Sequence, residues 1–481
     1  MTPPDEAVVS QKVLAGSFAS ELRALYEARQ FQRVVERFES AGQGIIPAFG
    51  GGAAVLHVAA QAYLRISDFS TSAETFLSAA AIHASNQSPE TSACVRNAFA
   101  ALQRLGLHAA AEWLALRSLS LPRECGGDVE LLRYTVAIAI QRGDLNLATC
   151  IIAAASLYAA TRAVALETLL DIACRPAKYG AADARLLQTG LDVHARDPKL
   201  SIIVCSRDDA RYAKFIAECE RAFCGSNFEV IRIADAKSMC EGYNRGTDAA
   251  TGELVLYCHD DIEFISVGVH RALISALADF DVATCVGSSV VDGPTWMCQD
   301  ATNSQGWIAE SDSESGCYSI AIIGVPNPRS LLASGDGCFI ACRRPVAQTL
   351  HWDEVTFDSF HLYDIDFCLR ARNNGFRVGV ARGVIINHLS QGSFDAVWHE
   401  HAQRFLQKHN IPSGPEAVNQ WISIQVGTRA EAARVASNLM NSVPADFHRQ
   451  LAALQGGSFD AACCEFPALA RFQSSIAELG Q

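Results

Sequence analysis

The chain has 481 residues, of which 49% are hydrophobic and 19% charged, so it is long enough for two or three folded domains and too apolar to be disordered. Its formal net charge of −13, with no run of Lys or Arg, argues against nucleic acid as the main ligand. The sequence shows no secretory signal and no continuous apolar stretch that predicts a membrane span. Because the 17 cysteines form no Cys-x-x-Cys motif, we expect reduced thiols and a cytoplasmic protein.

Residues 1–195 are rich in alanine and leucine and predict a series of helices with a period of 38 residues. Large apolar side chains recur at this spacing, at Phe31, Phe69, Leu107 and Leu145. The pattern predicts an α-solenoid of helical hairpins, because a single hairpin cannot bury its apolar face alone. The segment around Phe69 resembles a tetratricopeptide repeat. That resemblance implies a surface for a protein partner or acceptor, although such arrays also pack on neighbouring domains or dimerise.

A change of period after Asp197-Pro198 marks the start of an α/β domain that we expect to extend from residue 199 to about 410. Short apolar runs predict strands at 200–205, 228–233, 254–258 and 378–386. Helical patterns alternate with the first three runs, which indicates βαβ units and a mainly parallel sheet flanked by helices. No G-x-G-x-x-G follows the first strand and no P-loop sequence occurs, so dinucleotide-binding and P-loop chemistry are disfavoured.

Two adjacent carboxylates, Asp260 and Asp261, follow the third predicted strand. Ligands bind at the carboxyl ends of strands in open α/β sheets. Two like charges at that position repel unless a cation offsets them, and carboxylate oxygens suit Mg²⁺ or Mn²⁺, which also bind substrate phosphates. The pair therefore suggests a metal–diphosphate site. An isolated Asp-Asp pair is more often a solvated turn, so its surroundings decide between the two interpretations.

An ordered set of segments in this domain resembles a family 2-type glycosyltransferase with the GT-A fold. The matching segments are residues 243–246 (YNRG), 250–253 (ATGE), 259–261 (HDD), 334–337 (SGDG) and 360–370 (FHLYDIDFCLR). Two positions depart from the family pattern. His259 stands at the first Asp of the usual Asp-x-Asp motif, and Tyr363 replaces the usual Glu before Asp364.

The resemblance implies a metal-dependent, inverting transfer of a sugar from a nucleotide-sugar donor to a hydroxyl of a protein or glycan acceptor. It implies a Mn²⁺ or Mg²⁺ site formed by His259, Asp261 and His388. Asp364 is the expected general base, and its alternative role is to cap a helix over residues 365–374. Contacts with the nucleotide are expected from Ser206, Asp208, Asp235, Asn244 and Asp260.

For several other residues and segments, the sequence favours a structural role over a functional one. Asp366 falls in the first turn of the same helix, where the helix dipole favours a carboxylate. Trp296 and Trp307 lie in a Gly/Ser/Pro-rich stretch that suits an acceptor loop, although packing is their commoner role. The sequence His399-Glu400-His401 is not a zinc motif and is interpreted as surface. Residues 411–481 predict a helical tail without chemistry of its own.

Two other functions remain open from the sequence. The departures at His259 and Tyr363 allow a catalytically degenerate sugar-nucleotide fold that acts as a protein-interaction scaffold. A hydrolase or nucleotidyltransferase could use the same metal site, but the sequence offers no clear nucleophile and no second metal cluster.

Overall fold

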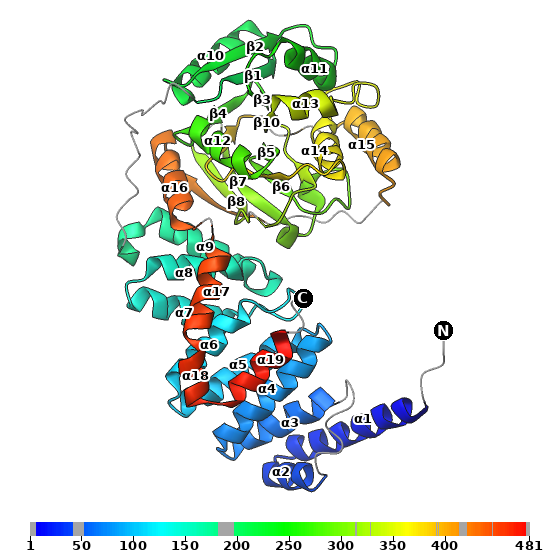
Figure 1. Ribbon diagram of the computed structural model, residues 1–481, viewed down its shortest axis with the longest axis vertical. Helices are drawn as coiled ribbons and strands as arrows, with labels where there is room; N and C mark the ends of the chain where they lie inside the picture. The colour runs from blue at the N-terminus through cyan, green and yellow to red at the C-terminus, as the bar shows by residue number, and fades with distance from the viewer. Residues whose placement is uncertain are drawn as a thin grey trace. The chain divides into compact units, whose positions relative to one another are not determined.

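The computed structural model describes residues 6–41, 52–180, 197–312, 315–327, 329–390, 392, 394–412, 421–444 and 446–477 (Figure 1). They divide into two compact units. A helical unit comprises Met1–Ala165 together with Asp446–Gln481, and an α/β unit comprises Leu166–Ala445. Among the described helices, none combines the length and the apolar character that crossing a membrane requires.

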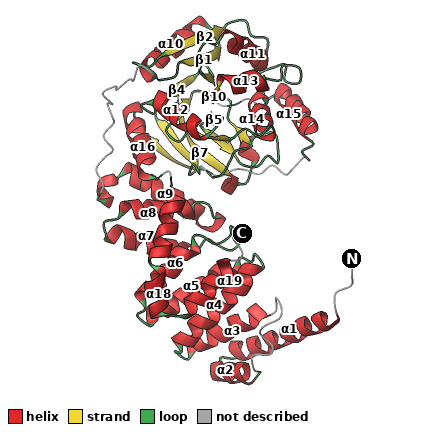
Figure 2. Ribbon diagram, in the orientation of Figure 1, coloured by secondary structure: helices red, strands yellow, loops and turns green. Residues whose placement is uncertain are grey.

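The N-terminal part is helical throughout its described residues (Figure 2). Its helices are α1 (Glu6–Glu27), α2 (Phe31–Ser40), α3 (Gly52–Arg65), α4 (Phe69–Ser85), α5 (Glu90–Arg104), α6 (His108–Ser118), α7 (Val129–Gln141), α8 (Leu145–Ala155) and α9 (Ala159–Cys174). Consecutive helices from α2 to α8 contact one another, as expected for stacked hairpins.

The same backbone turn precedes α2, α4, α6 and α8. Two residues before each helix start, the chain takes a left-handed conformation, at Arg29, Ser67, Gly106 and Gly143. Asp68 and Asp144 then cap α4 and α8 by accepting hydrogen bonds from backbone N–H groups of the first turn. The turns recur at a spacing close to the predicted period, while the repeat itself and its resemblance to tetratricopeptide repeats stay predictions.

The C-terminal helices pack on the helical unit. They are α17 (Phe447–Gly457), α18 (Phe459–Glu465) and α19 (Ala468–Ala477). Figure 1 shows them, in orange to red, running across α8, α6 and α4. Helix α17 contacts α8 and α6, α18 contacts α6, and α19 contacts α4. Phe472 and Ile476 are buried in the same core as Phe76. The indole of Trp113 donates a hydrogen bond to the carbonyl of Gln455 (3.0 Å).

The predicted boundaries differ from these units, because residues 411–481 are not one helical tail. Strand β13 (Ile422–Val426) and helix α16 (Arg429–Ser442) belong to the α/β unit, whereas α17–α19 belong to the helical unit. Strand β13 pairs antiparallel with β8 (Tyr318–Gly324). Its alternation of partly buried and exposed residues is that of an edge strand, which the sequence analysis missed in so short a segment.

The α/β unit is built on a six-stranded, mainly parallel sheet, which confirms the predicted fold class. Its strand order is β11-β5-β10-β3-β1-β2, and only β10 runs antiparallel to its neighbours. The strands are β1 (Leu200–Cys205), β2 (Phe228–Ile233), β3 (Leu254–Cys258), β5 (Val282–Thr284), β10 (Phe339–Arg343) and β11 (Val378–Val380). The first three match the predicted strands.

A second sheet contains β13, β8, β7, β12 and β4 in that order, with β6 and β9 joined at β7. Its remaining strands are β4 (Ile262–Phe264), β6 (Val286–Ser288), β7 (Ser304–Ser311), β9 (Ser334–Gly335) and β12 (Ile386–His388). The single strand predicted over 378–386 is therefore wrong. A turn closed by the N–H of Val384 on the carbonyl of Ala381 separates β11 from β12, which lie in different sheets.

Side chains of β3 alternate between two apolar cores on opposite faces of the six-stranded sheet. Leu256 and Cys258 pack with α10 (Asp209–Ala222) and α12 (Val269–Asp279). Tyr257 packs with α11 (Met239–Ala249), α13 (Arg344–Leu350), α14 (Tyr363–Asn373) and α15 (Ala396–His409). This double burial fixes β3, so the residues that follow Cys258 are held at a defined edge of the sheet.

Candidate metal and donor site

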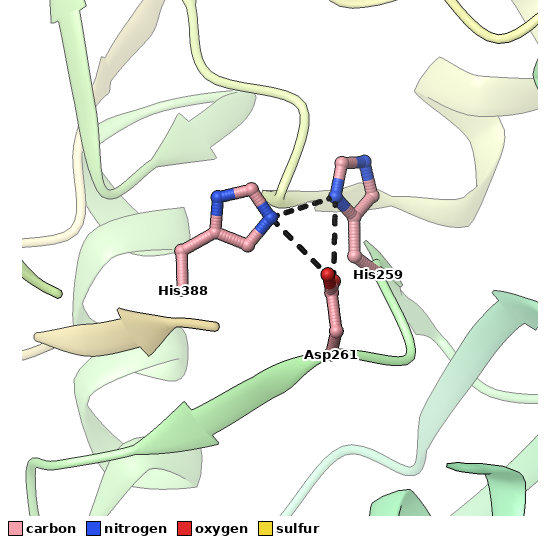
Figure 3. A group of neighbouring side chains, drawn as sticks. All are labelled: His259, Asp261 and His388. Atoms are coloured by element: carbon pink, nitrogen blue, oxygen red, sulfur yellow. Dashed lines mark hydrogen bonds and ion pairs between the residues drawn. The ribbon is translucent and has the colours of Figure 1, made fainter. Parts of the chain in front are cut away.

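The residues that follow β3, at the carboxyl edge of the six-stranded sheet, lie beside the end of β12 of the second sheet. Strands β4 and β12 pair antiparallel with Ile262 opposite His388, which places His388 next to Asp261. The backbone N–H of Leu389 also donates to the carbonyl of Asp261 (3.0 Å). Figure 3 shows His259, Asp261 and His388 pointing toward one another.

The three side chains offer one ligand atom each at mutual distances that fit a metal ion. His259 Nδ1 lies 3.2 Å from His388 Nε2, and Asp261 Oδ1 lies 3.5 Å from His388 Nε2 and 3.8 Å from His259 Nδ1. Metal–ligand bonds of about 2.0–2.2 Å put neighbouring ligand atoms roughly 3–3.5 Å apart. Two imidazoles and one carboxylate form a donor set that suits a transition metal such as Mn²⁺ better than Mg²⁺. The residues therefore fit the expected metal.

The pKa values of these three side chains are shifted by burial and by one another. Burial alone would raise the pKa of Asp261, but hydrogen bonds with His388 and Ser390 lower it overall. Burial would lower the pKa of His388, but Asp261 and Asp336 raise it overall. Burial and the neighbouring His388 lower the pKa of His259. The lowered pKa favours the neutral form of His259, which a metal ligand needs, and the raised pKa of His388 makes it the ligand for which protons compete.

A cavity of about 420 Å³ lies beside the metal group. Its lining combines apolar residues with charged groups: Cys205, Arg207, Asp208, Arg211, Ile233, Ala236, Met239, His259, Asp260, Asp261 and Phe360. Asp260 accepts a hydrogen bond from Ser206 Oγ (2.6 Å) and lies 3.4 Å from the guanidinium of Arg211. These contacts hold Asp260 in the wall of the cavity. Asp208 caps α10 from the same rim.

Two predicted donor contacts, Asp235 and Asn244, are absent from the lining of this cavity. Asp235 is 77% exposed and pairs with Arg245 (2.8 Å), so it stays a predicted contact at the outer rim. The amide of Asn244 forms hydrogen bonds with both the carbonyl (2.9 Å) and the N–H (2.8 Å) of Trp352. That pairing gives Asn244 a structural role in holding the Trp352 segment, and its contact with a nucleotide stays a prediction.

Asp364 lies in the first turn of α14. The helix begins at Tyr363, one residue after Leu362, which takes a left-handed conformation (φ 60°). The alternative that Asp364 caps the helix is therefore not supported. One carboxylate oxygen of Asp364 accepts a hydrogen bond from the N–H of Gly337 (2.9 Å). Burial and the nearby carboxylate of Asp336 raise the pKa of Asp364 to about 7, which suits a general base near neutral pH.

Comparison with known proteins shows that part of the chain is similar to a known family. Residues 201–414 match the model of the Glycosyltransferase like family, which covers less than half of the 481 residues. The α/β unit therefore carries a glycosyltransferase-like domain. No curated protein matches the chain.

Two solved structures resemble the chain weakly. One is the structure of GalNAc-T7 with UDP, GalNAc and Mn²⁺, with 10% identity, a TM-score of 0.32, and coverage of 44% of this chain and 48% of that one. This chain thus spans about half the length of that protein. The other is the mannosyltransferase PcManGT from Pyrobaculum calidifontis in complex with GDP-Man and Mn²⁺, with 13% identity, a TM-score of 0.30, and coverage of 66% and 95%. At these values neither likeness assigns an activity to this chain.

The glycosyltransferase-like domain contains site residues that the sequence analysis missed. Asp336 accepts hydrogen bonds from the indole of Trp296 (2.9 Å) and the N–H of Cys338 (2.9 Å), and it influences the pKa of both His388 and Asp364. Arg207 stacks on Phe360 (5.4 Å) in the cavity wall. Asp336 lies between two glycines of a recognised segment, which was the available sign. Arg207 and Phe360 are far apart in sequence, and nothing in the sequence pairs them.

Several residues prove to be structural. Trp296 and Trp307 are buried (6% and 1% exposed), so neither side chain is presented on an open loop. Asp366 is buried and bonded to Arg370, Lys408 and His409. The interpretation of residues 399–401 as surface is wrong for His401, which is 1% exposed. His401 lies on the buried face of α15 and interacts with Asp358 (3.1 Å).

Proposed function

We propose that this protein is a metal-dependent, inverting glycosyltransferase that moves a sugar from a nucleotide-sugar donor to an acceptor hydroxyl. The single observation that carries the proposal is the group of His259, Asp261 and His388. Its ligand atoms lie 3.2–3.8 Å apart at the carboxyl edge of the sheet, beside a cavity of about 420 Å³. The family match of residues 201–414 supports the assignment to sugar transfer.

The donor is proposed to lie in the cavity beside the metal group. Ile233, Ala236 and Met239 offer an apolar surface for a base, and Arg207 offers a stacking plane. Asp260, held by Ser206 and Arg211, offers an acceptor for ribose hydroxyl groups. A divalent ion held by His259, Asp261 and His388 would offset the charge of the leaving diphosphate.

Asp364 is the proposed base. Its carboxylate accepts the proton of the acceptor hydroxyl while the acceptor oxygen forms a bond to the anomeric carbon. The bond from that carbon to the diphosphate breaks, and the nucleoside diphosphate leaves with the electron pair. One displacement with one base inverts the anomeric centre. The hydrogen bond from Gly337 N–H to Asp364 helps to orient the carboxylate.

The test is a screen of nucleotide sugars in which release of the nucleoside diphosphate is measured with Mn²⁺, with Mg²⁺ and with a chelator. We expect release with at least one donor, fastest with Mn²⁺ and abolished by the chelator. Donor binding by the wild-type chain without any turnover, across candidate hydroxyl acceptors, would favour the alternative of a degenerate sugar-nucleotide fold that serves as a scaffold.

The helical unit is proposed to bind a protein partner or the acceptor. Helices α17–α19 already cover part of the surface of α8, α6 and α4. A partner would therefore contact the other helices or displace α17–α19. A pull-down with the full chain and with a variant that carries charged substitutions on α3 and α5 would test which helices a partner uses.

A further inference from the structure

The two positions at which this chain departs from the family 2 pattern touch each other. His259 stands in place of an Asp and Tyr363 in place of a Glu, and they are 104 residues apart in sequence. The hydroxyl of Tyr363 lies 2.6 Å from Nε2 of His259. The other ring nitrogen, Nδ1, is the atom that faces His388 and Asp261. One imidazole thus joins the metal group to Tyr363.

We propose that Tyr363 is a positioning residue for the metal group. Its hydroxyl accepts the Nε2–H of His259 and so directs the Nδ1 lone pair at the ion. The need for it follows from the replacement itself. A carboxylate binds a cation with either oxygen, whereas a neutral imidazole has one donor and one acceptor nitrogen and must be held in the right tautomer. The proposal rests on the proposed metal site and explains how this chain builds it with a histidine.

The surroundings of Tyr363 hold its hydroxyl in this position. Tyr363 is 3% exposed, and its ring contacts those of Tyr243 and Trp352, both with centroids 5.8 Å away. Gly337 is close enough that an added Cβ would lie 2.3 Å from the Tyr363 hydroxyl oxygen. The ring therefore has little freedom to turn away. Partners outside the ligand shell commonly fix histidine ligands in this manner.

A phenol also suits this position electrostatically. The hydroxyl of Tyr363 gives His259 a hydrogen-bond partner, whereas a carboxylate at the same place would add negative charge beside the metal group. The two residues are therefore chemically complementary.

The experiment compares Tyr363→Phe with Tyr243→Phe in the full chain. Tyr243 is a matched control because it is fully buried, contacts the same aromatic cluster, and has a hydroxyl without a hydrogen-bond partner among the described residues. Mn²⁺ affinity is measured by calorimetry, and folding by the melting temperature without metal. We expect Tyr363→Phe to bind Mn²⁺ about 10–100-fold more weakly, and Tyr243→Phe to match wild type.

A second pair of variants isolates the coupling. In a His259→Asp background, where no imidazole needs orienting, adding Tyr363→Phe should leave Mn²⁺ affinity unchanged. An equal loss in both backgrounds would overturn the proposal, as would wild-type affinity in Tyr363→Phe. A wild-type chain that binds no divalent ion would instead overturn the proposed function.

A measurement on the wild-type chain covers the case in which Tyr363→Phe fails to fold. Nitrogen NMR of the Zn²⁺-loaded protein, with ¹⁵N-labelled histidine, reports which ring nitrogen of His259 carries the proton. We expect the proton on Nε2 and the metal on Nδ1. The opposite assignment would show that Tyr363 does not direct this ligand.

Discussion

The metal group of the α/β unit and the α17–α19 contacts of the helical unit use their polar groups in different ways. In the α/β unit, His259, Asp261 and His388 each offer one ligand atom, and these atoms lie close enough together to hold a metal ion. In the helical unit, polar groups form hydrogen bonds between the C-terminal helices and the helices of the N-terminal part. The N–H of Ala110 donates to the carboxylate of Glu465 (2.9 Å), and the indole of Trp113 donates to a carbonyl of α17. The comparison predicts that substitutions at the proposed site change chemistry, and that substitutions in the core shared by α17–α19 change stability.

The sharpest test of this separation is Asp364→Asn. An amide keeps the shape of the side chain and an oxygen that can accept the N–H of Gly337, but it does not take up a proton. A positioned base typically contributes about 10²–10⁴-fold to rate, so transfer should fall by that factor. Donor affinity and melting temperature should change little. Steady-state kinetics beside thermal unfolding makes the measurement, and turnover close to wild type would exclude Asp364 as the base.

The counterpart in the helical unit is Phe472→Ala. Phe472 of α19 is 3% exposed in the core shared with α4 and α6, and removing a buried Phe side chain costs about 3–5 kcal/mol. We expect a loss of that size in the free energy of unfolding of the helical unit, with Mn²⁺ affinity unchanged. Leu454→Ala is the control, because Leu454 is 38% exposed on α17. A parallel loss of Mn²⁺ affinity would break the separation between the units.

The pH dependence of transfer gives a third test, and its sign follows from Asp364. Burial and Asp336 raise the pKa of Asp364 to about 7, so below that pH the carboxyl is protonated and does not act as a base. A bound cation favours the ionised form. We therefore expect kcat/KM to fall about tenfold per pH unit on the acid side of a midpoint at or below about 7. A profile without an acid limb would contradict this assignment.

Much of the fold could be predicted because local patterns determined it. The runs that form β1 and β3 are apolar at nearly every position, and their predicted bounds agree with the structure. The bounds of β2 agree as well, although this edge strand carries Glu229 and Arg232. The split of the predicted strand 378–386 was missed because a two-sheet arrangement depends on partners elsewhere in the chain. The destination of α17–α19 was missed for the same reason, since their apolar faces find partners more than 300 residues away.

In the candidate site, too, features that depend on local sequence could be predicted, and contacts between distant residues could not. The proximity of His259, Asp261 and His388 could be predicted because each stands in a recognisable segment at the end of a strand. The role of Asp364 as the base stays a prediction. The contact between His259 and Tyr363 could not be predicted, because it joins residues 104 positions apart, and in the sequence each was visible only as a departure from a pattern. Asn244 shows the converse, since its place in a motif suggested a ligand contact while its amide holds the backbone of Trp352.

The smallest expected effect concerns Asp235, the predicted donor contact that lies at the outer rim. Its carboxylate is 77% exposed and paired with Arg245, and an ion pair so exposed to solvent contributes little. If that pair is its whole role, Asp235→Ala should weaken donor binding less than about fivefold and leave the melting temperature almost unchanged. Asp260→Asn is the reference, because Asp260 lines the cavity and should lose more affinity. Calorimetric titration of both variants with the same nucleoside diphosphate and Mn²⁺ ranks them. An equal or larger loss at Asp235 would place the nucleotide at the outer rim rather than against Arg207 and Asp260.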